Sequence, residues 1–229
     1  MKKIFCYGLD LSCAHGAMVC LRNGKLHRAV FYTEKAGAAK AHKRGQRIAL
    51  PSSKEMPEQK MRAIVRLAWI DHWLAEDCRM IPKESYAALE DYALRAAHGA
   101  HQLGEVGGIA RLHLYRQGAN FRLHDPIALK MFVAHDGTAQ KDLIEHKVKK
   151  RWKVDFSDYN PVPTRGGKQD RTTSEDLADA FGLAQMVWTE YQLRMGLIRL
   201  SDLHEKEIRV FNRATKANPI NILGREWMK

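Results

Sequence analysis

The sequence predicts an α/β domain in which helices cover a mixed β-sheet, and three observations lead to that prediction. Apolar runs at residues 4–9, 17–21 and 26–32 follow one another with short polar breaks, which is typical of consecutive strands. From about residue 58 onward, helical periodicity alternates with short apolar runs. Hydrophobic residues make up 45% of the 229 positions, which is enough to bury the core of one large domain.

Tight turns join the first three predicted strands, and a basic segment follows them. Asn23-Gly24 separates the second and third apolar runs and is a strong hairpin signal. The stretch from 35 to 54 contains lysine and arginine but no acidic residue, and it lacks apolar periodicity. We interpret residues 34–57 as a basic insertion that contributes no core element.

Helices and short strands alternate through the rest of the chain. Predicted helices cover about 58–76, 98–115, 126–133 and 140–152, and predicted strands cover 86–89 and 120–123. The helix at 98–115 contains four glycines, each of which costs about 1 kcal/mol relative to alanine in a helix. We therefore expect another element to pack very closely against that helix.

The end of the chain divides into a loop, a long helix and a polar tail. Residues 153–173 are rich in proline, glycine and charge and predict a loop. Thr172 with Glu175 predicts a capping box at the start of the next helix. After about residue 196 periodicity is lost, so we assign 1–195 to the domain and 196–229 to a basic C-terminal extension.

The charge balance favours a polyanionic partner. Thirty-eight basic against 26 acidic residues give a net charge of +12, which suits nucleic acid or an acidic membrane surface. A merely basic protein without such a partner is the alternative. No run approaches the roughly 18 apolar residues of a membrane span, and the N-terminal apolar run is too short for a signal peptide. We therefore expect a cytoplasmic protein.

The four cysteines show neither C-x-x-C pairs nor zinc spacing, so we expect no disulfide and no structural zinc.

Acidic residues fall at the ends of predicted strands and at the start of the last long helix. Asp10 closes the first strand and Glu90 closes the strand at 86–89, while Asp176 and Asp179 lie three residues apart on one helix face. Such carboxylates repel one another unless cations lie between them. Their hard oxygen atoms suit Mg²⁺ or Mn²⁺, and two such ions can catalyse phosphodiester hydrolysis.

Each acid also has a structural interpretation. An aspartate after a strand is often a turn residue, and Asp176 can be an acid that stabilises the first turn of its helix. Glu90 is followed by Asp91, and one of the two can simply be solvated. Spacing alone leaves the catalytic and structural interpretations open.

Several short motifs together resemble the RuvC-type Holliday junction resolvases of the ribonuclease H-like superfamily. The resemblance spans about residues 3–190, in the family's order. It rests on Tyr7-Gly8-Leu9-Asp10, Ala88-Leu89-Glu90, the glycine-containing stretch Leu103 to Ala110, Leu129 to Val133 with Gln140-Lys141-Asp142, and Glu175 to Phe181. The chain departs from the family where Leu11-Ser12 replaces the usual Pro-Gly, in the basic insertion and after residue 195. These departures favour a bacteriophage-encoded member, acting in a bacterial cell or an infected host cell.

The resemblance implies a ribonuclease H-like fold and a homodimeric endonuclease that nicks two strands of a four-way DNA junction symmetrically. It implies two Mg²⁺ ions per active site, with Mn²⁺ as a substitute. The metal-holding residues implied are Asp10, Glu90, Asp176 and Asp179. Lys141 is implied as a catalytic cation beside them, although it can also be a solvated lysine on a basic helix.

Phosphate contacts require lysine and arginine near the metal site. The candidates for DNA binding are Lys43, Arg44, Arg47, Lys130, Arg165, Lys168 and Arg171. The alternative for the loop that carries Arg165 and Lys168 is a solvated, flexible segment. Two other functions stay open: a related nuclease acting on flaps, forks or RNA–DNA hybrids, and a DNA-binding protein without catalysis. Failure to bind Mg²⁺ or Mn²⁺ would favour the second of these.

Overall fold

The protein contains one mixed six-stranded sheet with helices on both faces. The computed structural model describes residues 2–33, 45–49, 59–91, 100–160, 171–213 and 222–228, with the backbone alone at 45–49, 59–63 and 100–102. The strand order is β4-β3-β2-β1-β5-β6. The β1–β2 and β2–β3 pairs are antiparallel, whereas β1–β5, β5–β6 and β3–β4 are parallel. The predicted fold class is confirmed.

The strands lie close to their predicted positions, with one exception. Their bounds are β1 Phe5–Leu11, β2 His15–Arg22, β3 Lys25–Thr33, β4 Gly45–Ala49, β5 Tyr86–Glu90 and β6 Asn120–His124. Asn23 and Gly24 have φ values of 52° and 77°, as a tight hairpin requires. Strand β4 lies inside the basic insertion and forms an edge strand of the sheet, which the sequence did not predict. Strand β4 is held by backbone hydrogen bonds to β3. Any sequence can form such bonds, so no apolar periodicity in the sequence marks this strand.

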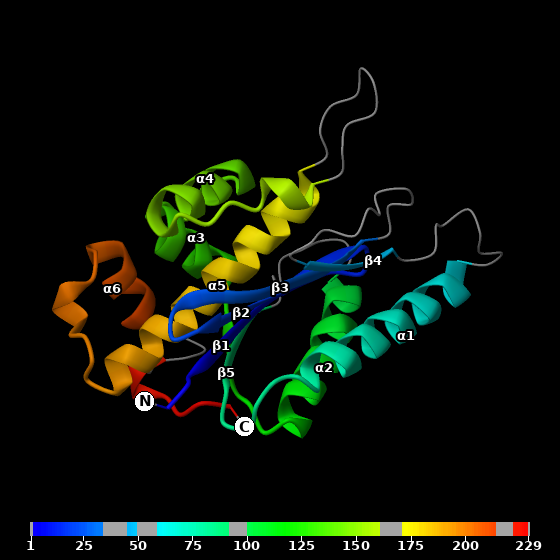
Figure 1. Cartoon of the computed structure of the whole chain (residues 1–229), viewed down its shortest axis with the longest axis horizontal. Helices are drawn as coiled ribbons and strands as arrows, with labels where there is room; N and C mark the ends of the chain where they lie inside the picture. Colours follow the sequence, from blue (N-terminus) through cyan, green and yellow to red (C-terminus); the bar gives the residue numbers. More distant parts are fainter. Residues whose placement is uncertain are drawn as a thin grey trace, which may run out of the picture.

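The helices form two layers around the sheet (Figure 1). Their bounds are α1 Gln59–Cys78, α2 Ala100–Arg116, α3 Pro126–Ala134, α4 Lys141–Trp152, α5 Thr172–Arg194 and α6 Glu205–Phe211. Helices α1 and α2 cover one face, and α5 with α3 and α4 covers the other. Alternate residues of a strand point to opposite faces, so Tyr7 and Leu9 join the cluster under α1 and α2 while Cys6 joins the cluster under α5. No helix in the ranges described is long and apolar enough to cross a membrane.

Helix α5 packs directly on β1 because Gly8 has no side chain. A Cβ atom at Gly8 would lie 1.9 Å from the carbonyl oxygen of Ala180 and 2.5 Å from the amide nitrogen of Ala184. The helix backbone therefore rests on the strand backbone. This contact brings the acidic start of α5 to the end of β1 that carries Asp10.

The glycines of α2 contradict an expectation from the sequence. Among the described residues, a Cβ atom at Gly104 or at Gly108 would meet nothing within 4 Å. The prediction that another element packs closely against this helix is therefore wrong at these two positions. The sequence shows that glycines weaken this helix, but it does not show which residues pack beside them.

The start of α5 is stabilised by a distant residue instead of the predicted capping box. The N-cap residue is Arg171, and no side-chain capping bond forms there. The Ser174 amide donates to Asn160 Oδ1 at 2.9 Å, and Asn160 Nδ2 donates to Ser174 Oγ at 2.8 Å. The prediction from Thr172 and Glu175 is wrong because a tertiary contact supplies the partner that a local motif would supply.

The segment after residue 196 packs onto the same domain. Val210 and Phe211 of α6 belong to the hydrophobic cluster under α5, and Met228 pairs with Phe121 of edge strand β6. The guanidinium of Arg122 lies 4.7 Å from the ring centre of Trp227. The last residues of the chain thus cover part of the outer edge of the sheet.

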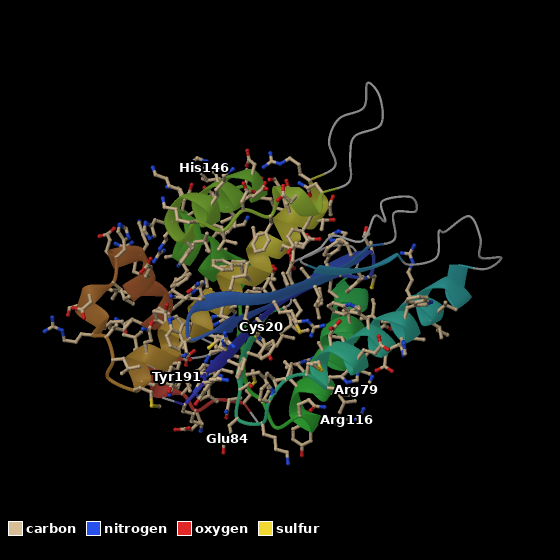
Figure 2. All side chains as sticks on the ribbon, viewed as in Figure 1. Cys20, Arg79, Glu84, Arg116, His146 and Tyr191 are labelled. Carbon is tan, nitrogen blue, oxygen red and sulfur yellow. The ribbon has the colours of Figure 1, made fainter. Side chains whose placement is uncertain are left out.

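Arg122 joins β6, α5 and the C-terminal segment through one buried ion pair. Its Nε and Nη2 atoms donate to the two carboxylate oxygens of Glu190 at 3.0 and 2.7 Å, and the Glu190 side chain is 0% exposed. We expect Arg122→Ala to lower the free energy of unfolding by about 3 kcal/mol, because it removes the two-bond partner of a buried carboxylate and leaves Glu190 with Arg194 alone. Urea denaturation measures this change. The exposed Arg116, on the outer side of α2 in Figure 2, provides the control. Equal small effects of Arg122→Ala and Arg116→Ala would contradict the prediction.

Candidate active site

Four acidic side chains meet at one edge of the sheet. Asp10 and Glu90 lie at the carboxyl ends of β1 and β5, which are adjacent parallel strands with Leu9 opposite Leu89. Asp176 and Asp179 come from the first two turns of α5. Burial raises the pKa of Asp10 well above its ordinary value, and repulsion from the other three acids raises it further. The residues predicted as a cluster therefore lie close enough to influence one another's ionisation.

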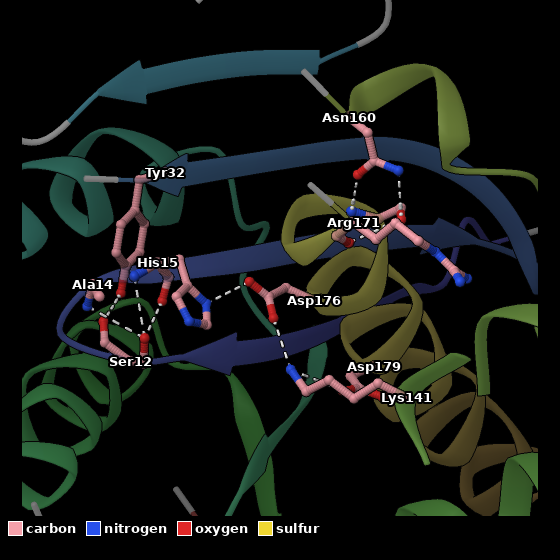
Figure 3. A network of polar contacts seen from close by, with 10 residues as sticks. Ser12, Ala14, His15, Tyr32, Lys141, Asn160, Arg171, Asp176 and Asp179 are labelled. Atoms are coloured by element: carbon pink, nitrogen blue, oxygen red, sulfur yellow. Dashed lines mark hydrogen bonds and ion pairs between the residues drawn. The ribbon is translucent and has the colours of Figure 1, made fainter. Parts of the chain in front are cut away.

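Lys141, the first residue of α4, lies against this cluster (Figure 3). Its Nζ atom is 2.9 Å from Oδ1 of Asp176 and 3.7 Å from Oδ2 of Asp179. Burial by itself lowers the pKa of Lys141, but attraction to Asp10, Asp176 and Asp179 outweighs burial and raises it. Lys141 is thus a charged ammonium, and it neutralises only part of the negative charge around it.

Asp179 and Glu90 also resist ionisation. Asp179 is 8% exposed, and burial, with repulsion from Glu90 and Asp176, raises its pKa to about 7 even though Lys141 acts in the opposite direction. Burial likewise raises the pKa of Glu90. A site in which carboxyl groups are this hard to deprotonate gains stability from any cation that binds between them.

The cluster opens into a cavity of about 340 Å³. Its polar lining includes Asp10, Glu90, Asp91, Asp179, Lys130, Lys141 and His15. Leu9, Leu89 and Leu129 line it as well, so the charged groups lie next to apolar walls. Such walls strengthen electrostatic interactions between the side chains and a bound group.

Two histidines near the cluster were not identified from the sequence. His15, at the start of β2, places Nδ1 2.5 Å from Oδ2 of Asp176. His124 lies opposite Glu90 in the β5–β6 register and is 2% exposed. Neither of its ring nitrogens has a hydrogen-bond partner in the part of the chain that the structure describes. A lone histidine in a turn or at a strand end carries no pattern that would reveal these positions.

His124 adds no positive charge to the site. Burial, together with the nearby Arg122, lowers its pKa to about 3. Its ring is therefore neutral at physiological pH, although it lies on the strand next to Glu90. Positive charge at the cluster comes from Lys141 and, at Glu90, from Lys130 as well, while His15 is a further hydrogen-bonding partner of Asp176.

The donor set suits a hard divalent cation by its chemistry. All four acids offer carboxylate oxygens, the ligands that Mg²⁺ and Mn²⁺ prefer. Among the described residues, no three histidine, cysteine, aspartate or glutamate side chains are close enough together to hold an ion as they stand. Binding of an ion therefore requires the carboxylates to turn toward a common point.

The candidates for DNA binding are only partly placed. Lys130 on α3 lines the cavity, whereas Arg171 forms an ion pair with Glu145 of α4 and keeps 46% of its side chain exposed. Arg47 lies in β4, where the structure describes only the backbone. Lys43, Arg44, Arg165 and Lys168 lie outside the described residues. Lys149 and Lys150 of helix α4 are also exposed and add positive charge to the surface. The label of His146 marks the solvent-facing side of this helix in Figure 2.

Comparison with known proteins identifies the fold. No family model matches the sequence, and no curated protein matches it. The structure of Thermus thermophilus RuvC is 17% identical, with a TM-score of 0.51, over 84% of this chain and 97% of that chain. The structure of T. thermophilus RuvC in complex with Holliday junction substrate is 18% identical, with a TM-score of 0.53, over 84% and 96%. The chain thus has a RuvC-like α/β fold of the ribonuclease H type.

Proposed function

We propose that this protein is a Mg²⁺-dependent endonuclease that resolves Holliday junctions by two-metal-ion hydrolysis of phosphodiester bonds. The observation that carries the proposal is the meeting of four carboxylates and Lys141 at the carboxyl ends of β1 and β5 in a RuvC-like fold, where Asp10, Glu90, Asp179 and Lys141 line one cavity. A structural neighbour in complex with Holliday junction substrate supports branched DNA as the substrate class. A related nuclease for flaps, forks or RNA–DNA hybrids is the alternative.

In this proposal Asp10, Glu90, Asp176 and Asp179 hold the ions. Bound Mg²⁺ ions would lower the pKa of a water molecule and stabilise the departing oxygen. The ammonium of Lys141 lies where it can contact the scissile phosphate, because it lines the same cavity as three of the acids. The apolar walls limit the access of bulk water to the reacting groups.

The basic surface provides the DNA contacts in this proposal. A net charge of +12 attracts the phosphate backbone at long range. Lys130 places positive charge at the cavity itself. Symmetric cutting of a four-way junction requires two active sites, so we propose that the protein acts as a homodimer. Its place of action would be the cytoplasm, where the DNA of a bacterial or infected cell lies.

The proposal is tested by nicking of a synthetic four-way junction in Mg²⁺, with linear duplex, flap and RNA–DNA hybrid as parallel substrates. Wild type should introduce paired, symmetric cuts in the junction. Asp10→Asn and Glu90→Gln should abolish cutting but keep junction affinity, because losing a negative charge does not weaken attraction to phosphate. Weak binding with cleavage retained would rule out the metal-site assignment.

Other outcomes of the same assay separate the competing functions. Preferential cutting of a flap or hybrid would keep the metal site and change the substrate. Tight junction binding without any cutting, and without binding of Mg²⁺ or Mn²⁺, would identify a DNA-binding protein with a nuclease fold.

Neutralising Lys130 tests whether the cavity faces DNA. We expect Lys130→Ala to weaken junction binding and to reduce the slope of log affinity against log salt by about 1, because one phosphate contact is lost. Fluorescence anisotropy in Ca²⁺ at several salt concentrations measures the slope. Lys83→Ala, at an exposed position before β5, is the control. An unchanged slope for Lys130→Ala would show that the phosphate backbone passes elsewhere.

A further inference from the structure

Asp176 is held on both sides, by one donor at each carboxylate oxygen. Lys141 Nζ lies 2.9 Å from Oδ1, and His15 Nδ1 lies 2.5 Å from Oδ2 (Figure 3). Asp176 itself is only 2% exposed, whereas both of its partners line the cavity. An ionised carboxylate can only accept hydrogen bonds. We therefore assign the proton of the contact to Nδ1 of His15.

The turn that carries His15 is held rigidly by its own hydrogen bonds. Ser12 Oγ donates to the His15 carbonyl at 2.6 Å and accepts from the His15 amide at 3.1 Å. The Ser12 amide also donates to the His15 carbonyl at 2.9 Å. These bonds close a compact turn between β1 and β2, so the backbone of His15 has little freedom.

Tyr32 anchors this turn to the core. Its hydroxyl donates to the Ser12 carbonyl, and its ring packs edge-on against Trp73 at a centroid distance of 4.9 Å. A Cβ atom at Gly16 would lie 2.7 Å from the same ring, so the strand that follows His15 also packs against Tyr32. A buried aromatic pair thus fixes the point from which His15 reaches Asp176.

We propose that His15 is a positioning residue of the carboxylate site, which fixes the orientation of Asp176 opposite Lys141. The effect on cleavage rests on the function proposed above, whereas the contact itself does not. Each carboxylate oxygen has two lone-pair sites, so a hydrogen bond from His15 leaves Asp176 able to bind a metal ion as well.

Loss of His15 would leave Oδ2 of Asp176 buried without a donor. The carboxylate could then turn away, and Lys141, which contacts Asp176 and Asp179 together, would lose its fixed position. Removing a group that orients a metal ligand typically costs about 10- to 100-fold in activity or metal affinity. We expect an effect of that size.

The kinetic test compares three variants on the four-way junction. His15→Ala should lower kcat by about 10- to 100-fold with little change in KM, because Asp176 is buried and only 2% exposed. His15→Asn should recover most of kcat, since its Nδ2 donor occupies nearly the position of Nδ1 in histidine. His27→Ala, an exposed histidine near the Asn23-Gly24 turn, is the control and should match wild type. Full activity of His15→Ala, or loss of activity in His15→Asn equal to that in His15→Ala, would overturn the proposal.

Two measurements without DNA keep the test independent of nuclease activity. In the metal-free protein, ¹⁵N NMR should show a slowly exchanging proton on Nδ1 of His15 that disappears in Asp176→Ala. Mn²⁺ binding, followed by electron paramagnetic resonance, should weaken in His15→Ala and recover in His15→Asn. An unprotonated Nδ1, or unchanged Mn²⁺ affinity in a folded His15→Ala protein, would contradict the proposal. If wild type cuts no substrate, the proposed function fails while these two measurements still decide the role of His15.

Discussion

Replacing Gly8 by alanine is expected to destabilise the protein and to disrupt the cluster of four carboxylates. The added methyl group would lie 1.9 Å from the backbone oxygen of Ala180. No side-chain rotation can relieve this clash, because the methyl carbon is fixed to the backbone of β1 and the oxygen belongs to the backbone of α5. Overpacking of a core typically costs about 1–3 kcal/mol, and we expect Gly8→Ala to reach the upper end of that range. Thermal unfolding should show a decrease of roughly 5–10 °C in Tm.

The same substitution should separate α5 from β1 in any protein that still folds. Asp176 and Asp179 would move away from Asp10, so cleavage and metal binding should both be lost. Gly108→Ala in α2 is the matched control, because a Cβ atom there meets nothing within 4 Å among the residues that the structure describes. That change should leave Tm unchanged or raise it, since alanine favours a helix by about 1 kcal/mol over glycine. A folded, fully active Gly8→Ala protein would contradict the packing of α5 on β1.

Asp179→Asn is expected to abolish cleavage and, in the absence of divalent ions, to stabilise the protein. The pKa of Asp179 is raised from 3.8 to about 7 by burial first and then by neighbouring acids. Above pH 7 the folded protein therefore holds an unfavourable charge that the unfolded chain carries without cost. Each pKa unit corresponds to about 1.4 kcal/mol, so removing this charge should raise the free energy of unfolding at pH 8 by about 2–4 kcal/mol.

The sign of the pH dependence follows from the same shift. As pH falls through 7, the folded state takes up a proton at Asp179 that the unfolded state does not take up until near 3.8. Wild-type stability in EDTA should thus rise from pH 8 toward pH 5, and Asp179→Asn should flatten that rise. Urea denaturation at several pH values measures both curves.

An exposed aspartate provides the control for this experiment. Hydrogen bonds from Thr138 lower the pKa of Asp136, so Asp136→Asn should bring no stabilisation at pH 8. Addition of Mg²⁺ should raise the Tm of wild type and of Asp136→Asn, but not that of Asp179→Asn. Destabilisation of Asp179→Asn in EDTA would show that the ionised carboxylate is a favourable structural partner, and the account of repelling carboxylates would then be wrong.

Much of the fold was predictable because local patterns encode it. Consecutive apolar runs and Asn23-Gly24 predicted the β1–β2–β3 hairpins, and three- and four-residue spacing predicted the long helices. Asp10 and Glu90 could be placed at the same sheet edge because each ends a strand. Strand β4 was missed because an edge strand is held by backbone hydrogen bonds, which every sequence can form.

The surroundings of the site were less predictable. His15 reaches Asp176 across 161 positions of sequence, and no local motif encodes such a contact. The C-terminal segment shows no periodicity, yet Arg122, Glu190 and Trp227 tie it to the sheet. The capping box failed for a related reason, since Asn160 replaced the local partner of Ser174.

The sequence by itself determined the order and type of the main elements and the residues able to form a carboxylate cluster, because periodicity and strand ends are local properties. Only the tertiary structure decided how close those carboxylates lie and which neighbours hold them. The direct packing of α5 on Gly8, the position of Lys141 and the orientation of His15 depend on elements far apart in the chain. Burial and mutual repulsion then raise the pKa values of Asp10, Glu90 and Asp179, and those effects exist only after the elements have packed together.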